Sequence, residues 1–375
     1  MFETLLSTDG LLLGKILPFL IVLTIVVFVH EMGHYLIGRW CGIGAKAFSI
    51  GFGPELIGFN DRHGTRWKLC AIPLGGYVKF VGDMNATSTP DNQELEKLSA
   101  AEQKVAFHTQ PVWKRAATVF AGPAFNFLLT IAVFAVFFAI YGRTVFEPTV
   151  AQVQPNSPAA AAGFLPGDRF VSVEGNPVQT FDDVQRYVSG RAGDQLVFVM
   201  RRGDQEITLT ATPELRTIQS PLGDQKIGAI GVIQTRELGA PRAIEYGPVA
   251  AVGEAVKQTG HIVQSTGRFL KRLVVGREDR CQLGGPIRIA DMAGKAAQQG
   301  PELFIQLIAF LSVGIGILNL LPIPPLDGGH LAFYAIEAVM RRPVSEKTME
   351  AVYRAGFVLV MTFMVFVFWN DIFGC

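Results

Sequence analysis

The chain is unusually apolar for its length of 375 residues: 49% of them are hydrophobic, 17% are charged, and the mean hydropathy is +0.32. This composition excludes an ordinary soluble globular protein and predicts a polytopic membrane protein, with the lipid bilayer as its surroundings. A net charge of +1 provides no basic field for nucleic acid, which is therefore not an expected partner.

Four apolar segments approach the length of about 20 residues that a membrane-spanning helix needs. They are residues 14–38, 116–141, 303–321 and 355–369. The first lacks a small-residue cleavage site, so we interpret it as a retained span rather than a signal peptide. Lysine and arginine cluster after the first span, just before the second, and between the third and the fourth. The positive-inside rule makes these loops cytoplasmic and predicts that both termini and residues 142–300 lie on the opposite side.

The first span carries His30-Glu31-Met32-Gly33-His34 inside its apolar run. Ionisable side chains cost about 2.5 kcal/mol or more each within lipid, so three in five positions indicate a functional site. Residues four apart lie on nearly one face of a helix. The H-E-x-x-H spacing therefore lets His30 and His34 hold one Zn²⁺ while Glu31 acts as general base on its water. The alternative is a chance match, in which a histidine merely bonds a neighbouring helix.

The segments between the spans differ in character. Residues 47–82 show alternating stretches and glycine pairs that predict β-hairpins, and their apolarity favours a β-loop that dips toward the membrane. Residues 149–212 consist of short β-rich runs and two brief helical stretches, enough for one small domain. Residues 242–300 follow the pattern of amphipathic helix. The chain thus divides into an N-terminal membrane core (1–141), the small domain, the amphipathic segment and a C-terminal membrane core (301–375).

A catalytic zinc needs three protein ligands and an open position, so His30 and His34 require a third residue. Asp327 follows the third span in a stretch with three prolines and two glycines, which favours it as that ligand. It could instead cap a helix that begins at Gly328.

Three further polar residues have more than one interpretation. His330 lies one helical turn beyond Asp327, and a supporting role fits it better than ligation, because three ligands already complete the set. Asn319 and Asn126 are lone amides in apolar helices. Either one can form a helix–helix hydrogen bond or hold a substrate backbone near the metal.

Five motifs occur together along the chain: His30-Glu31-Met32-Gly33-His34, Phe48-Ser49-Ile50-Gly51-Phe52-Gly53, Pro73-Leu74-Gly75-Gly76-Tyr77-Val78-Lys79, Ala121-Gly122-Pro123-Ala124-Phe125-Asn126-Phe127 and Leu326-Asp327-Gly328-Gly329-His330. In combination they resemble the site-2 protease family of intramembrane zinc metalloproteases, in its bacterial branch of the regulator of sigma-E protease (RseP) type. The resemblance runs nearly from end to end of the chain.

This resemblance implies roles for individual residues. It implies that His30, His34 and Asp327 bind zinc, that Glu31 activates water, and that Asn319 helps to hold the substrate chain. It also implies that residues 48–81 form a membrane-associated β-loop that receives substrate as an added strand. Residues 149–212 then resemble a PDZ domain, and only one such domain is evident where the best-known member of the family carries a tandem pair.

The expected fold is a polytopic α-helical membrane protein with four transmembrane helices, a membrane-associated β-loop and a PDZ-like α+β domain. By the resemblance, the chain is a zinc metalloendopeptidase of the bacterial inner membrane, with its active site toward the cytoplasmic side and its PDZ-like domain in the periplasm. Its expected partners are transmembrane protein substrates, cut within their membrane segments. Anti-sigma-factor-like proteins that have already received a first cut are the expected kind.

Two other classes of function compete with this interpretation. One is a non-enzymatic PDZ-bearing membrane scaffold, and the intact set of His30, Glu31 and His34 argues against it. The other is a metal transporter, which would need polar residues continued across several spans, whereas here they cluster at one depth. Neither the oligomeric state nor the identity of the substrate follows from the motifs.

Overall fold

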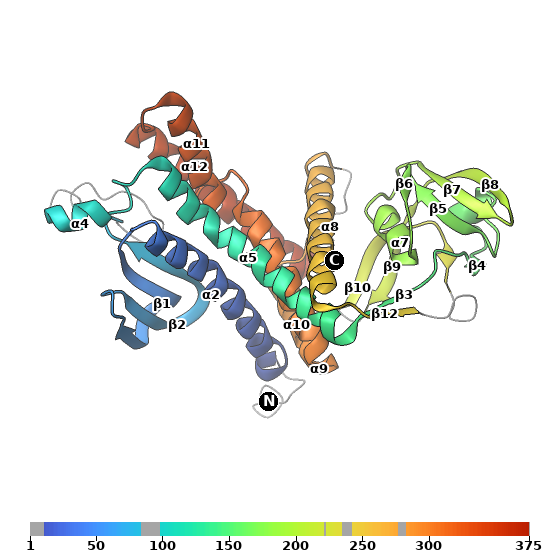
Figure 1. Ribbon diagram of the computed structural model, residues 1–375, viewed down its shortest axis with the longest axis horizontal. Helices are drawn as coiled ribbons and strands as arrows, with labels where there is room; N and C mark the ends of the chain where they lie inside the picture. Colours follow the sequence, from blue (N-terminus) through green and yellow to red (C-terminus); the bar gives the residue numbers. More distant parts are fainter. Residues whose placement is uncertain (1–10, 84–97, 221–222, 235–241, 277–282, 375) are drawn as a thin grey trace. The chain divides into compact units, whose positions relative to one another are not determined.

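The computed structural model describes residues 11–83, 98–220, 223–234, 242–276 and 283–374. The chain divides into two compact units (Figure 1). The membrane unit consists of Met1–Phe134, Gln258–Val263 and Leu283–Cys375, and the strand-rich unit consists of Ala135–Lys257 and Gln264–Gln282. Helices α5 (Val112–Tyr141) and α8 (Pro248–Val274) contribute to both units.

Four helical segments of the described chain are long and apolar enough to cross a membrane: Leu13–Trp40, Val112–Tyr141, Pro301–Asn319 and Lys347–Phe373. They contain helices α2 (Leu17–Trp40), α5, α10 (Pro301–Asn319) and α12 (Glu346–Trp369). Each coincides with one predicted span, although several ends differ by two to nine residues. The third helix stops at Asn319, before the prolines. The fourth begins about nine residues before the predicted 355, because Ser345 caps it by accepting a hydrogen bond from the Thr348 backbone N–H.

Small residues let α2 approach its neighbours closely. A Cβ at Gly33 would lie 2.8 Å from the carbonyl carbon of Ala121, so α2 and α5 pack backbone against backbone. Nearer the start of α2, Val22 and Val26 are fully buried against Ile308 of α10. The Thr130 hydroxyl joins the other two helices by donating to the Ala309 carbonyl over 3.0 Å. These contacts hold α2, α5 and α10 together as the frame of the membrane unit.

The β-loop predicted over 47–82 is one long hairpin of β1 (Ala45–Asn60) and β2 (Arg66–Phe80), which lies against α2 (Figure 1). Both strands bend, so that Phe48 pairs with Val78 on one side and with Trp67 on the other. Phe48 is fully buried and stacks on Trp67 at 4.3 Å. As a result, residues 76–80 lie at an outer edge of this small sheet, where no further described strand pairs with them.

Helices α11 and α9, from the last part of the chain, complete the membrane unit. Helix α11 (Asp327–Met340) is joined to α5 by the Arg115–Glu337 ion pair at 2.6 Å. Helix α9 (Pro286–Gln299) begins at the Asp371 carboxylate, which accepts hydrogen bonds from the backbone N–H groups of Gly285, Ile287 and Arg288. A carboxylate at this end is favourable because it faces the positive end of the helix dipole. The region predicted as amphipathic helix over 242–300 is therefore mainly α8 and α9.

The strand-rich unit is built on a four-stranded sheet in the order β6-β5-β7-β8, with α7 (Phe181–Ser189) beside it. Its strands are β5 (Arg169–Val173), β6 (Asn176–Pro177), β7 (Leu196–Arg202) and β8 (Gln205–Ala211). Phe170, Phe198 and Met200 fill the core. Thr180 and Asp183 form a capping box that starts α7.

The core of this unit draws on residues beyond the predicted limit of 212. Ile230 is buried in the same cluster as Phe170, and β11 (Val232–Ile233) pairs with β4 (Gln152–Val153). The remaining elements are η1 (Leu11–Ile16), α4 (Ala100–Val105), β3 (Arg143–Val145), α6 (Pro158–Ala161), β9 (Glu214–Ser220), β10 (Gly223–Ala229), β12 (Arg242–Ile244) and η3 (Asn370–Gly374).

Candidate metal centre

The three side chains predicted as metal ligands converge in the membrane unit. His30 and His34 follow each other by one turn on α2, and their Nε2 atoms are 3.1 Å apart. Asp327 Oδ2 lies 3.1 Å from His30 Nε2 and 3.5 Å from His34 Nε2. All three side chains are largely buried, with exposed fractions of 10%, 12% and 16%. They are the one such cluster of possible ligands within the described residues.

The spacing of these three atoms fits a tetrahedral zinc ion. Ligands bound to zinc at about 2.0–2.2 Å lie about 3.3–3.6 Å from one another at tetrahedral angles, close to the separations found here. The buried Asp327 Oδ2 also has no satisfactory hydrogen-bond donor. Two imidazole nitrogens and an unsatisfied carboxylate oxygen that face one point suit a cation, because each can offer it a lone pair.

One face of α5 supports both imidazole rings. The Thr118 backbone carbonyl lies 2.9 Å from His34 Nδ1, and the Asn126 side chain lies 3.1 Å from His30 Nδ1. Gly122 lies between them, and a Cβ there would come within 2.8 Å of His30 Cε1 and closer still to His34 Nε2. The sequence motif includes Gly122 and Asn126, but it does not predict that Thr118 supports His34. The i, i+4, i+8 spacing of these three residues was the available signal.

The chain between α10 and α11 brings Asp327 to the histidines. It contains Pro322, Pro324 and Pro325 and turns back so tightly that a Cβ at Gly329 would lie 2.6 Å from the Pro324 nitrogen. Helix α11 starts at Asp327 itself, its N-cap residue is Leu326, and no side chain caps it by a hydrogen bond. The alternative in which Asp327 caps a helix that begins at Gly328 is therefore not what the structure has.

A cavity of about 310 Å³ adjoins the three atoms. Glu31 lines it from α2, Asn319 from the end of α10, and Gly76 and Val78 from the edge of β2. A Cβ at Gly76 would lie 3.1 Å from Glu31 Cγ, so this strand edge packs directly against the Glu31 side chain. The Asn319 side chain is half-buried, and its amide makes no hydrogen bond to a described residue. The cavity thus places a carboxylate, a free amide and a strand edge beside the cluster.

The other two predicted polar residues, Asn126 and His330, differ in whether they contact the three converging side chains. Asn126 is fully buried and meets His30, so it belongs to the site. His330 lines the cavity but is not one of the three converging residues; its ring lies within hydrogen-bonding distance of the Tyr353 hydroxyl. Its place beside the cluster agrees with a supporting role.

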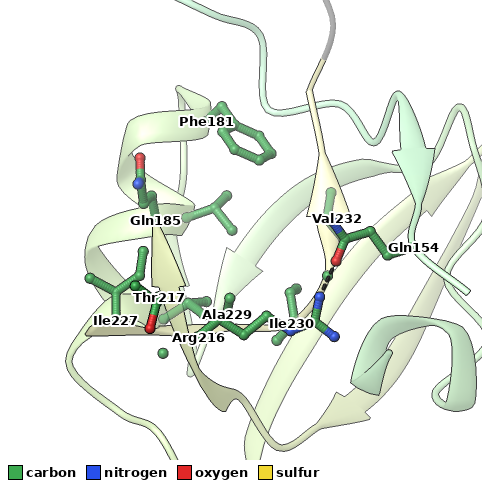
Figure 2. Close-up of a pocket in the computed structure, with 13 residues that line it drawn as sticks. Gln154, Phe181, Gln185, Arg216, Thr217, Ile227, Ala229, Ile230 and Val232 are labelled. Atoms are coloured by element: carbon green, nitrogen blue, oxygen red, sulfur yellow. Dashed lines mark hydrogen bonds between the residues drawn. The ribbon is translucent and has the colours of Figure 1, made fainter. Parts of the chain in front are cut away.

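A second cavity, of about 370 Å³, lies within the strand-rich unit (Figure 2). Phe181 and Gln185 of α7 line one side, and Ile230 and Val232 line the other. Arg216 reaches across its floor to hydrogen-bond the Gln154 side chain. The walls are mainly apolar with a few polar groups, which is the usual character of a groove that takes up a peptide or small ligand.

Comparison with known proteins gives consistent matches. The family model described as Peptidase family M50 matches residues 18–363. A protein of Mesorhizobium japonicum named "Putative zinc metalloprotease" is 70% identical over 365 residues, which cover 97% of this chain and 100% of that protein. Metalloprotease MmpA of Caulobacter vibrioides is 40% identical over 376 residues, which cover 94% of each chain. The PDZ domain of an SdrC-like protein from Listeria monocytogenes aligns with 26% of this chain and 93% of its own at 18% identity, with a TM-score of only 0.20.

Proposed function

Because the chain belongs to peptidase family M50, we propose that it is an intramembrane zinc metalloprotease that hydrolyses peptide bonds within the membrane-spanning segments of other proteins. The observation that carries this proposal is the convergence of His30 Nε2, His34 Nε2 and Asp327 Oδ2 at 3.1–3.5 Å within apolar helices. Three such atoms match the three protein ligands of a catalytic zinc, which leaves one position for water.

In this mechanism His30, His34 and Asp327 hold the zinc ion. Bound zinc lowers the pKa of water toward 7 and polarises a carbonyl group. Glu31, which shares the cavity with the ligands, takes the proton of the attacking water and later gives it to the leaving amine. Gly76 packs closely against Glu31, where a Cβ would lie 3.1 Å from Glu31 Cγ, and so limits the positions open to this side chain.

The substrate is a membrane-spanning helix that must unwind before it can be cut, since helical amides are hidden in their own hydrogen bonds. The edge of β2 at Gly76–Val78 borders the cavity and can bind the unwound segment as an added strand. Asn319, whose amide has no partner within the described chain, is positioned to hydrogen-bond the substrate backbone.

The distribution of charge supports an orientation in the bacterial inner membrane. The loops rich in lysine and arginine face the cytoplasm, and the strand-rich unit, a PDZ-like domain, faces the periplasm. There the domain excludes proteins with bulky periplasmic parts, so that anti-sigma-factor-like substrates are admitted only after a first cut. Its groove between α7 and Ile230 is the surface available to a peptide segment (Figure 2).

The deciding experiment uses Glu31→Gln in liposomes with a single-span reporter that lacks its periplasmic domain. Glutamine keeps the shape of glutamate but cannot take a proton, so we expect normal zinc content and no cleavage. Glu302→Gln, at the exposed start of α10, is the matched control and should cleave as the wild type does. Mass spectrometry of the wild-type products should locate the cut inside the span. Near-normal cleavage by Glu31→Gln, or a cut outside the span, would refute the proposal.

A further inference from the structure

The two imidazole rings of the metal centre are supported by different kinds of group. His34 Nδ1 meets a backbone carbonyl, that of Thr118, which no substitution removes. His30 Nδ1 meets the side chain of Asn126, at 3.1 Å. The support of His30 therefore depends on the identity of a single residue on another helix.

The position of the hydrogen on the His30 ring decides which atom of the Asn126 amide can bond to Nδ1. A histidine that binds metal through Nε2 carries its hydrogen on Nδ1, so that Nδ1 can only donate. The Asn126 amide nitrogen also can only donate, whereas its oxygen Oδ1 is buried and has no hydrogen-bond partner. A half-turn of the amide, which exchanges two groups of nearly equal shape, brings the unsatisfied acceptor onto the His30 N–H.

The rest of Asn126 is held firmly in place. Its backbone carbonyl accepts a hydrogen bond from the Ser312 hydroxyl of α10 over 3.0 Å, and its side chain is fully buried. Gly316 of α10 packs against it, and a Cβ there would lie 3.3 Å from Asn126 Cβ. An amide fixed from two helices can define the plane of the ring that it contacts.

We propose that Asn126 is a positioning residue of the metal centre: its Oδ1 accepts the Nδ1–H hydrogen of His30 and so fixes Nε2 of that ring toward the metal. The inference rests on the proposed zinc site and goes beyond it, because it assigns a role to a residue that contacts neither metal nor substrate. Partners of this kind set the orientation and basicity of a ligating imidazole, and their loss commonly weakens metal binding about 10–100-fold.

The test measures zinc affinity by chelator competition on the detergent-solubilised full chain. Asn126→Ala should weaken zinc binding about 10–100-fold. Asn126→Asp, which keeps an acceptor oxygen, should restore affinity to within a few fold of the wild type. Absorption of the Co²⁺-loaded protein should shift in the alanine variant and return in the aspartate variant. If Asn126→Ala does not fold, Asn126→Leu, of similar volume and without polar atoms, replaces it.

Asn370→Ala is the matched control, because Asn370 is also a buried amide of the membrane unit and bonds the Leu283 carbonyl far along the chain from the cluster. It should lower thermal stability and leave zinc affinity unchanged. Zinc affinity of Asn126→Ala within about twofold of the wild type, a loss equal to that of Asn370→Ala, or an aspartate variant no better than alanine would overturn the inference. A double variant of His30 and His34 to alanine that still binds zinc would instead refute the proposed site itself.

Discussion

Gly122 leaves room for the two imidazole rings of the proposed metal centre. It lies on α5 directly against both imidazole rings, where a Cβ would overlap His34 and crowd His30. We expect Gly122→Ala to push the rings apart and to weaken zinc binding by at least about tenfold, as other disturbances of ligand orientation do. The measurement is zinc content after dialysis against a weak chelator.

Gly314→Ala provides the comparison for that variant. Gly314 is also a glycine within a membrane helix, but an added Cβ there meets nothing within 4 Å. Its zinc content should equal that of the wild type. Equal zinc content in both alanine variants would mean that the rings can shift without cost to the site.

A second residue-scale prediction concerns the Asp168–Arg202 ion pair of the strand-rich unit, whose oxygen and nitrogen lie 2.7 Å apart. Burial raises the pKa of Asp168, but the hydrogen bonds from Arg202 and the Leu165 backbone outweigh it and hold that pKa below its ordinary value. The stabilisation is therefore complete above the unfolded pKa of about 3.9 and is lost as the pH falls through the lower folded pKa.

We accordingly expect Asp168→Asn to destabilise this unit at pH 7 and to match the wild type once the pH lies below the lowered folded pKa of Asp168. Hydrogen exchange at the Leu165 amide, which donates to the Asp168 carboxylate, reports the difference directly. Faster exchange in the variant that persisted unchanged into acid would show that the carboxylate charge is not the source of the effect.

At the scale of elements, the Asp371 carboxylate ties the end of the chain to the start of α9. It accepts hydrogen bonds from three backbone N–H groups that the helix itself leaves unsatisfied. We expect Asp371→Ala to cost about 0.5–2 kcal/mol of stability and to speed amide exchange at residues 285–288. Asp371→Asn, which keeps one acceptor oxygen, should retain part of the protection. No change at these amides would contradict the capping role.

The elements show which parts of the fold were accessible from sequence. The apolar runs predicted α2, α5, α10 and α12, because composition alone marks a membrane helix. Helix α12 was predicted too short, since its first turns are charged and their helicity depends on the Ser345 cap. The participation of Ile230 and β11 in the strand-rich core could not be predicted, because that pairing joins segments about 80 residues apart.

The same limit explains what could be predicted of the site. The spacing of His30 and His34 is local, so the sequence contains it. Their support from Thr118 and Asn126 joins positions 84 and 96 residues apart. Helical spacing places these two residues on one face of α5 but does not reveal which helix that face meets. Asp327 was predicted through the resemblance and its irregular chain, and the structure brings it within 3.5 Å of both histidines.

At the scale of the whole molecule, residues 148–241, the greater part of the strand-rich unit, form one continuous insertion between two paired strands. Strands β3 and β12 pair at its base, with Val145 opposite Arg242, so a short glycine–serine turn can replace residues 148–241. All three converging residues belong to the membrane unit, and we expect the shortened protein to keep its zinc and to cut a trimmed substrate at the wild-type rate.

Selectivity should change instead. A substrate that retains a large periplasmic domain should be cut by the shortened protein and resisted by the full chain, if the insertion filters by size. Cleavage rates for the two substrates in liposomes distinguish this from a delivery role. Slower cleavage of the trimmed substrate after the deletion would show that the domain delivers substrate rather than excluding it.

The three converging residues are also separated along the chain, with Asp327 about 290 positions after His34. Since bacterial ribosomes add roughly 5–20 residues each second, about 15–60 s pass between the synthesis of His34 and that of Asp327. On the proposed ligand set, a nascent chain that has inserted only its first two spans holds no complete metal site. On that ligand set, the order of synthesis delays proteolytic competence until nearly the whole chain has been made.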